Sequence, residues 1–219
     1  MNEWLVLRRQ PWRENDWLLE LFCKQAGRLN VIAPAKYSLD LMQEYQGIWA
    51  KSAENSSGLV QIKAIQNQHE LMPTHHLISC AWYATELLQQ LLPAAEPMPQ
   101  LYDFYRATLS AFSDVNTAPE PWLRLFEAHL LSALGFGVSW QHDSDGHPID
   151  TDRHYQFVLE QGWQPSAMSR DSCRGQHLLD IHHNQLQPIS LRIMKQVQQQ
   201  ILQHISDKPI YSRALLIAG

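Results

Sequence analysis

The densest group of polar side chains in the sequence has the composition of a metal site. It combines imidazoles and carboxylates within thirteen positions: His142, Asp143, Asp145, His147, Asp150, Asp152 and His154. Both groups are common ligands of divalent cations, and residues 143–146 resemble half of a calcium-binding loop. However, Gly146 comes at the fourth position rather than the sixth, and no glutamate stands at the twelfth, as such a loop requires. We therefore predict a solvated acidic loop that binds no metal.

Motifs that carry covalent or phosphate chemistry are missing from the sequence. It contains no GxxxxGK followed by Ser or Thr, no GxGxxG and no GxSxG. The cysteines, Cys23, Cys80 and Cys173, are far apart and form no CxxC pair, which argues against a disulfide framework and a zinc knuckle. Cys173 lies between Asp171 and Arg174 and could be an activated thiolate, but no partner histidine is identifiable. We predict a protein that is not an enzyme and needs no cofactor.

Basic and aromatic residues are interleaved near the amino terminus. The basic ones are Arg8, Arg9, Arg13, Lys24, Arg28 and Lys36, and the aromatic ones are Trp4, Trp12, Trp17, Phe22 and Tyr37. Cationic grooves with aromatic stacking platforms bind single-stranded nucleic acid. The alternative is that the aromatic rings fill a core and the charges are solvated. The net charge of −5 argues against a protein that coats nucleic acid with its whole surface, so any such site is local.

The segments that carry these residues have the pattern of short strands. Strands are expected at residues 4–9, 16–22, 28–33, 45–53 and 59–66. Turns are expected at residues 24–27, where Gly27 suits a positive φ, and at residues 55–58. Five strands within about 70 residues favour a small barrel, and the five-stranded OB-fold is the leading candidate.

After Pro73 the hydrophobic period becomes helical. Helices are expected at residues 75–92, 101–112, 120–134 and 190–205, and residues 211–218 form a short terminal helix or a tail. Thr74 is a candidate N-cap, and Gly135 ends the third helix. Residues 138–142 are expected to pair with residues 155–159 as a hairpin. The prediction is an α+β chain: an OB-fold domain over residues 1–73, then a mainly helical domain over 74–219 with a β-hairpin insertion near 136–164.

The sequence also bears on location. No stretch approaches the ~20 apolar residues that span a bilayer, and the first residues lack the features of a signal peptide. We expect a cytoplasmic protein without membrane contact.

Three segments, in order, resemble the RecO family of recombination mediators. They are LVLRRQPWRENDWLLELFCKQAGRLNVIAPAK (residues 5–36), PEPWLRLFEAHLLSALGFGVSW (119–140) and KPIYSRALL (208–216). The middle segment matches best, because the family carries an Arg-Phe-Glu helix that ends in Leu-Gly-aromatic-Gly before a strand. The resemblance is to the proteobacterial branch that lacks a four-cysteine zinc site.

The resemblance implies a DNA repair and recombination mediator of the nucleoid. It implies binding and annealing of single-stranded DNA, work with RecR, recognition of the acidic tail of single-strand-binding protein, and, indirectly, loading of RecA. The matching DNA-binding positions are Arg9, Arg13, Arg28 and Lys36. Those that match a partner-peptide notch are Arg124, Leu130, Leu134 and Phe136; among these we expect Arg124 to be exposed and Leu130 to belong to the core.

One segment and one single residue depart from the family pattern. Residues 37–44 hold two acids and no base where a strongly basic loop is usual, and Leu125 replaces one of two paired arginines. We therefore expect weak DNA binding, because each lost phosphate contact lowers affinity. One alternative is a protein-interaction adaptor whose OB-fold has lost most of its DNA affinity. Another is a metal hydrolase that uses the His142–His154 loop.

Overall fold

The computed structural model describes residues 2–51 and 60–216. The chain divides into two compact units, residues 1–119 with 210–219, and residues 120–209. This division differs from the predicted boundary after residue 73, because the helices up to residue 112 group with the barrel. The predicted turn at residues 55–58 lies outside the described residues.

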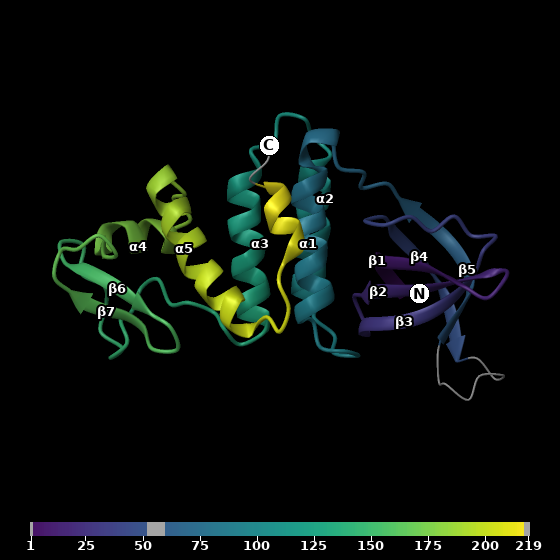
Figure 1. Ribbon diagram of the computed structural model, residues 1–219, viewed down its shortest axis with the longest axis horizontal. Coiled ribbons are helices and arrows are strands. Elements are labelled where there is room, and N and C mark those ends of the chain that lie inside the picture. Colours follow the sequence, from purple (N-terminus) through teal and green to yellow (C-terminus); the bar gives the residue numbers. More distant parts are fainter. Residues whose placement is uncertain (1, 52–59, 217–219) are drawn as a thin grey trace. The chain divides into compact units, whose positions relative to one another are not determined.

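The first unit contains a closed barrel with strand order β1-β2-β3-β5-β4 (Figure 1). Its strands are β1 (Asn2–Trp12), β2 (Asp16–Cys23), β3 (Gly27–Pro34), β4 (Glu44–Lys51) and β5 (Val60–His69). Consecutive strands pair antiparallel from β1 to β3, β3 pairs parallel with β5, and β1 pairs with β4 to close the barrel. The predicted OB-type barrel is therefore confirmed.

Alternating residues of the strands fill the barrel. Trp4 is fully buried at its centre, and its ring lies 5.2 Å from that of Trp49. Its buried neighbours are aliphatic or aromatic and include Val6, Leu19, Leu21, Val31, Tyr45 and Ile62. Gly27 has the predicted positive φ, at 71°, and a side chain there would collide with the backbone of Glu96. The tight β2–β3 turn therefore requires glycine.

Two helices, α1 (Ile78–Leu91) and α2 (Pro99–Phe112), complete most of the first unit. A 3₁₀ turn, η1 (His75–Leu77), precedes α1, and Thr74 stands at its N-cap position without a side-chain capping bond. The buried hydroxyls of Thr85 and Tyr105 lie 2.7 Å apart and join the two helices. The carboxylate of Glu86 accepts the backbone N–H groups of Tyr211 and Ser212, and so fixes the terminal turn η2 (Tyr211–Leu216) on α1.

The second unit combines three helices with a small sheet. The helices are α3 (Pro119–Ala133), α4 (Gly175–His182) and α5 (Pro188–Ile205), and the strands are β6 (His154–Val158), β7 (Gly162–Ser166) and β8 (Cys173–Arg174). Gly135 ends the α3 segment with a φ of 85°, as predicted. Among the helices of the described residues, none is both long and apolar enough to span a membrane.

The predicted pairing of residues 138–142 with 155–159 is wrong. β6 pairs on one edge with β7, where Phe157 lies opposite Trp163, and on its other edge with β8. Both edges of β6 are therefore occupied, so residues 138–142 cannot pair with it. A hairpin does form, but between β6 and β7. Glu160 in its turn and Gly162 at the start of β7 both have positive φ.

Candidate nucleic-acid interface

One end of the barrel brings together two exposed cations. The backbone N–H of Ala35 donates to the carbonyl of Asn15 at 2.8 Å, which holds the β1–β2 turn beside the turn after β3. These turns carry Arg13 and Lys36, both exposed. The Lys36 ammonium lies 5.1 Å from the centre of the Tyr37 ring. Within the described residues neither cation has an acidic partner, so both charges are available to a phosphate.

Arg9 is more constrained. Its guanidinium donates to the carbonyl of Leu39 at 2.9 Å and to the carboxylate of Asp40 at 3.0 Å, and it lies 4.9 Å from the centre of the Trp17 ring. The side chains of Arg9 and Asp40 are 32% and 51% exposed. Because an ion pair this exposed contributes little free energy, Arg9 can exchange Asp40 for a phosphate without much cost.

Arg28 lies away from the end of the barrel that carries Arg13 and Lys36. It is the second residue of β3, whereas Lys36 follows the end of that strand, about 20 Å away at the usual rise of a strand. Its guanidinium donates to Glu20 at 2.7 Å and to the carbonyl of Gln89 in α1 at 3.1 Å. The structure therefore places Arg28 in contacts that join the barrel to α1, and does not bring it to the end that carries Arg13 and Lys36.

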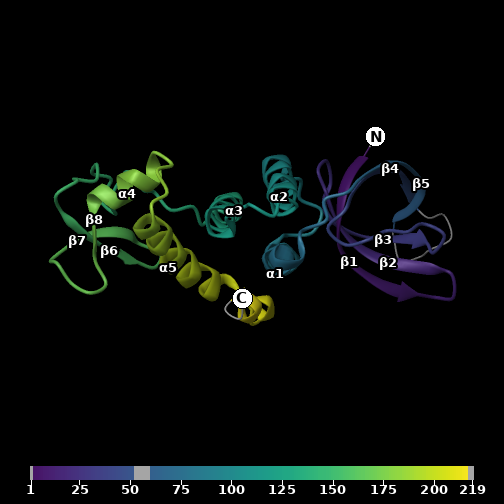
Figure 2. The same ribbon diagram turned by 90° about the horizontal axis from the view of Figure 1, so that it is seen from above.

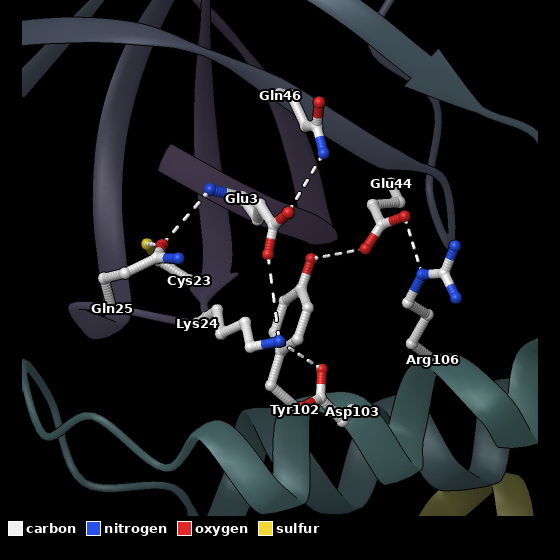
Figure 3. Close-up of polar contacts among 9 residues, drawn as sticks. All are labelled: Glu3, Cys23, Lys24, Gln25, Glu44, Gln46, Tyr102, Asp103 and Arg106. Atoms are coloured by element: carbon white, nitrogen blue, oxygen red, sulfur yellow. Dashed lines mark hydrogen bonds and ion pairs between the residues drawn. The ribbon is translucent and has the colours of Figure 1, made fainter. Parts of the chain in front are cut away.

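Lys24, another of the interleaved cations, belongs to a polar network that the sequence did not reveal (Figure 3). Its ammonium lies 2.6 Å from Asp103 of α2, and this hydrogen bond raises the pKa of Lys24 above its ordinary value. Beside these contacts, Glu44 accepts hydrogen bonds from the hydroxyl of Tyr102 and from Arg106. No motif or spacing marks these residues, because their partners are distant in sequence.

The acidic loop in the second unit is held by its own backbone. One carboxylate oxygen of Asp143 accepts the backbone N–H groups of Asp145 at 3.0 Å and His147 at 2.8 Å, a turn typical of aspartate. The side chains of these three residues do lie within 4.8 Å of one another, close enough to share an ion. The absence of a bound metal therefore stays a prediction.

Comparison with known proteins identifies the family to which this chain belongs. The model of the recombination protein O carboxy-terminal region matches residues 74–216 of this chain. The chain belongs to the RecO family. A DNA repair protein RecO from Nitrosospira multiformis is 30% identical over 96% of this chain and 92% of its own length. A DNA repair protein RecO from Stutzerimonas stutzeri is 31% identical over 97% of this chain and 91% of its own length. A third, from Methylococcus capsulatus, is 30% identical over 96% of this chain and 90% of its own length. A role in DNA repair follows from this family membership.

The RecO resemblance also suggested a partner-peptide notch, and the structure places its members differently. Leu130 is fully buried, as expected, but the expected exposure of Arg124 is wrong, because only 2% of its side chain is accessible. Its guanidinium lies 2.9 Å from the carboxylate of Glu127, which is also fully buried. Arg124 can be buried because its positive charge and the negative charge of Glu127 neutralise each other inside the second unit.

The other two notch residues follow α3. Leu134 is half-buried, whereas Phe136 is 45% exposed. Phe136 lines a pocket of about 590 Å³, together with residues of the β6–β7 hairpin and α5. Asp143 and Glu160 line the same pocket, and His204 lies 2.8 Å from Glu160. This RecO-family chain therefore presents an apolar anchor point at Phe136, without lysine or arginine in the pocket lining.

Proposed function

We propose that this protein is a non-enzymatic mediator of DNA repair and recombination that binds and anneals single-stranded DNA through one end of its barrel. The observation that carries the proposal is the juxtaposition of Arg13 and Lys36 beside Tyr37. Cations bind phosphates and an aromatic ring stacks on a base, which together hold a single strand without reading its sequence. Arg9, above Trp17, would add a third cation.

Charge reversal at this end of the barrel tests the proposal. The variant Arg13→Glu/Lys36→Glu should bind a fluorescent oligothymidine at least tenfold more weakly, and the slope of log affinity against log salt should fall by about 1.4, or roughly 0.7 per lost phosphate contact. Arg153→Glu/Lys208→Glu in the second unit changes the net charge equally and is the control. Equal affinities for the two variants would refute the assignment.

The partners form the finer part of the proposal. We propose that this protein binds RecR and the acidic tail of single-strand-binding protein. As a result of these interactions, RecA would be loaded onto single-stranded DNA. The apolar end of the tail would use Phe136 as its anchor, since Arg124 and Leu130 are buried. Phe136→Ala should weaken binding of a tail peptide in calorimetry, while Met168→Ala, which also removes an exposed apolar side chain, should not. Unchanged peptide affinity in Phe136→Ala would place the docking site elsewhere.

Loading of RecA has its own assay. On DNA coated with single-strand-binding protein, the protein with RecR should shorten the lag before RecA hydrolyses ATP. An unchanged lag would favour the second candidate, an adaptor whose barrel has lost DNA affinity. The ion pair Arg28–Glu20 favours that candidate, because it neutralises a cation that the family resemblance assigned to DNA binding.

A further inference from the structure

The second unit contains a wide groove next to the Phe136 pocket, with which it shares Phe157 and Trp163. Its volume is about 870 Å³, and its walls come from β6, the segment 170–174, the start of α4 and one side of α5. Figures 1 and 2 show these elements next to one another. The groove lies wholly within residues 154–203, so it does not depend on how the two units are placed.

Positive charge is concentrated in this groove. Residues 120–209 hold 10 acidic and 7 basic side chains, yet three of the basic ones, Arg170, Arg174 and Arg192, line the groove with a single acid, Asp171. Arg170 and Arg192 have no acidic partner in the part of the chain that the structure describes. Arg174 lies 3.4 Å from Asp152, but both side chains are more than half exposed, so this pair is weak.

Carboxamides cover much of the remaining wall. Gln196, Gln199, Gln200 and Gln203 continue from Arg192 along α5, and Gln156 faces them from β6. From Arg192 to Gln203 the helix rises about 17 Å. A carboxamide both donates and accepts hydrogen bonds, as a nucleobase edge requires.

Most of the apolar side chains of the groove are deeply buried. Trp163, Ile193 and Val197 are at most 5% exposed, and Phe157 and Ile189 are half-buried. A short acidic peptide with an apolar end would need a fully accessible anchor pocket, which these side chains do not form. The exposed groups of the groove are mainly guanidinium and carboxamide groups. These can bind the alternating phosphates and bases of a nucleic-acid strand.

We propose that this groove is a second binding site for single-stranded nucleic acid, with phosphates at the arginine end and bases against the glutamines of α5. The class of ligand rests on the proposed function, but no residue of the barrel takes part. Two sites on one chain would let the protein hold two strands, as annealing requires.

Neutralising the arginines tests the groove. Arg170→Gln/Arg192→Gln should lower the affinity for a short fluorescent oligothymidine about tenfold, since each charge-assisted contact is lost, and should reduce the salt slope by about 1.4. Arg153→Gln/Lys208→Gln removes the same charge outside the groove and should bind like the unmodified protein. Circular dichroism and melting curves establish that both variants are folded; equal affinities of the two folded variants would overturn the proposal.

Photo-crosslinking separates this inference from the proposed function. An oligonucleotide containing 4-thiothymidine should crosslink to peptides within residues 154–203 as well as to the barrel, and the groove crosslinks should persist in Arg13→Glu/Lys36→Glu. Crosslinks confined to the barrel would overturn the second site and leave the proposed function standing; no oligonucleotide binding at all would overturn both. If Arg170→Gln/Arg192→Gln loses binding of an oligoglutamate peptide but not of oligothymidine, the groove binds acidic peptides and the proposal is wrong.

Discussion

The hydroxyl of Tyr102 in α2 donates a 2.9 Å hydrogen bond to the carboxylate of Glu44 in β4, 58 positions earlier in the chain (Figure 3). The other oxygen of Glu44 accepts from Nε of Arg106 at 2.7 Å. Tyr102 is fully buried and Glu44 is 3% exposed. The pair therefore joins the barrel to the helices inside the first unit, through a charge that has little contact with water.

Removing this hydroxyl should destabilise the protein. Tyr102→Phe leaves Glu44 with one donor fewer, and hydrogen bonds to charged groups contribute about 1.5–3 kcal/mol. We expect a decrease of about 2 kcal/mol in the free energy of unfolding, measured with urea. Tyr211→Phe removes a hydroxyl from a side chain that is 73% exposed and should change stability by less than about 0.5 kcal/mol. Similar values for the two variants would contradict the role of the pair.

Tyr102 also predicts a response to alkaline pH. Burial, and then the charge of Glu44, raise the pKa of Tyr102 above its ordinary value of 10.0. The folded state therefore keeps this proton when the unfolded chain releases it, so stability is fully present below pH 10 and falls as the pH rises above it. Tyr102→Phe should lose less stability than the unmodified protein between neutral pH and pH 11, as followed by urea unfolding at each pH. An identical decline in both proteins would argue against this contribution.

Arg124 should affect folding rather than docking. Breaking a buried ion pair costs about 3–5 kcal/mol, so Arg124→Glu, which places two acids side by side in the second unit, should lower the melting temperature strongly. Lys195→Glu is the control, because Lys195 lies 3.9 Å from Glu120 and both side chains are more than 40% exposed. A fully stable Arg124→Glu protein that has lost peptide binding would instead support a direct contact.

The acidic loop should not depend on metal. Because Asp143 accepts two backbone N–H groups, Asp143→Ala should lower stability by about 1–2 kcal/mol whether or not a chelator is present. Asp145→Ala, at an exposed position, should have little effect. Protein of known metal content whose melting temperature falls on addition of chelator would contradict this prediction, since a bound ion stabilises the folded state.

Cys173 should be a slow nucleophile. Burial raises the pKa of its thiol from 9.0 to about 11, which lowers the fraction of thiolate at neutral pH by about 100-fold. Alkylation of Cys173 by iodoacetamide, followed by mass spectrometry, should therefore be about 100-fold slower in the folded protein than in urea. Comparable rates in the two states would indicate an activated thiolate.

The sequence alone determined the local elements and the family. Short apolar runs, and alternation at residues 28–33 and 59–66, marked the strands of the barrel. Gly27 marked its tight turn, and the helical period marked α1, α2, α3 and α5. Each of these signals depends on near neighbours in the chain. The ordered matches at residues 5–36, 119–140 and 208–216 identified the RecO resemblance for the same reason.

Only the tertiary structure decided which of these residues are accessible. Arg13 and Arg28 are both cations on the barrel, but Arg28 is held by Glu20 and the carbonyl of Gln89. Arg124 is buried because Glu127 neutralises it inside the second unit, and the glutamines of α5 line a groove because the segment 170–174 lies opposite them. Burial and charge compensation depend on partners brought together by folding, and no local pattern specifies those partners.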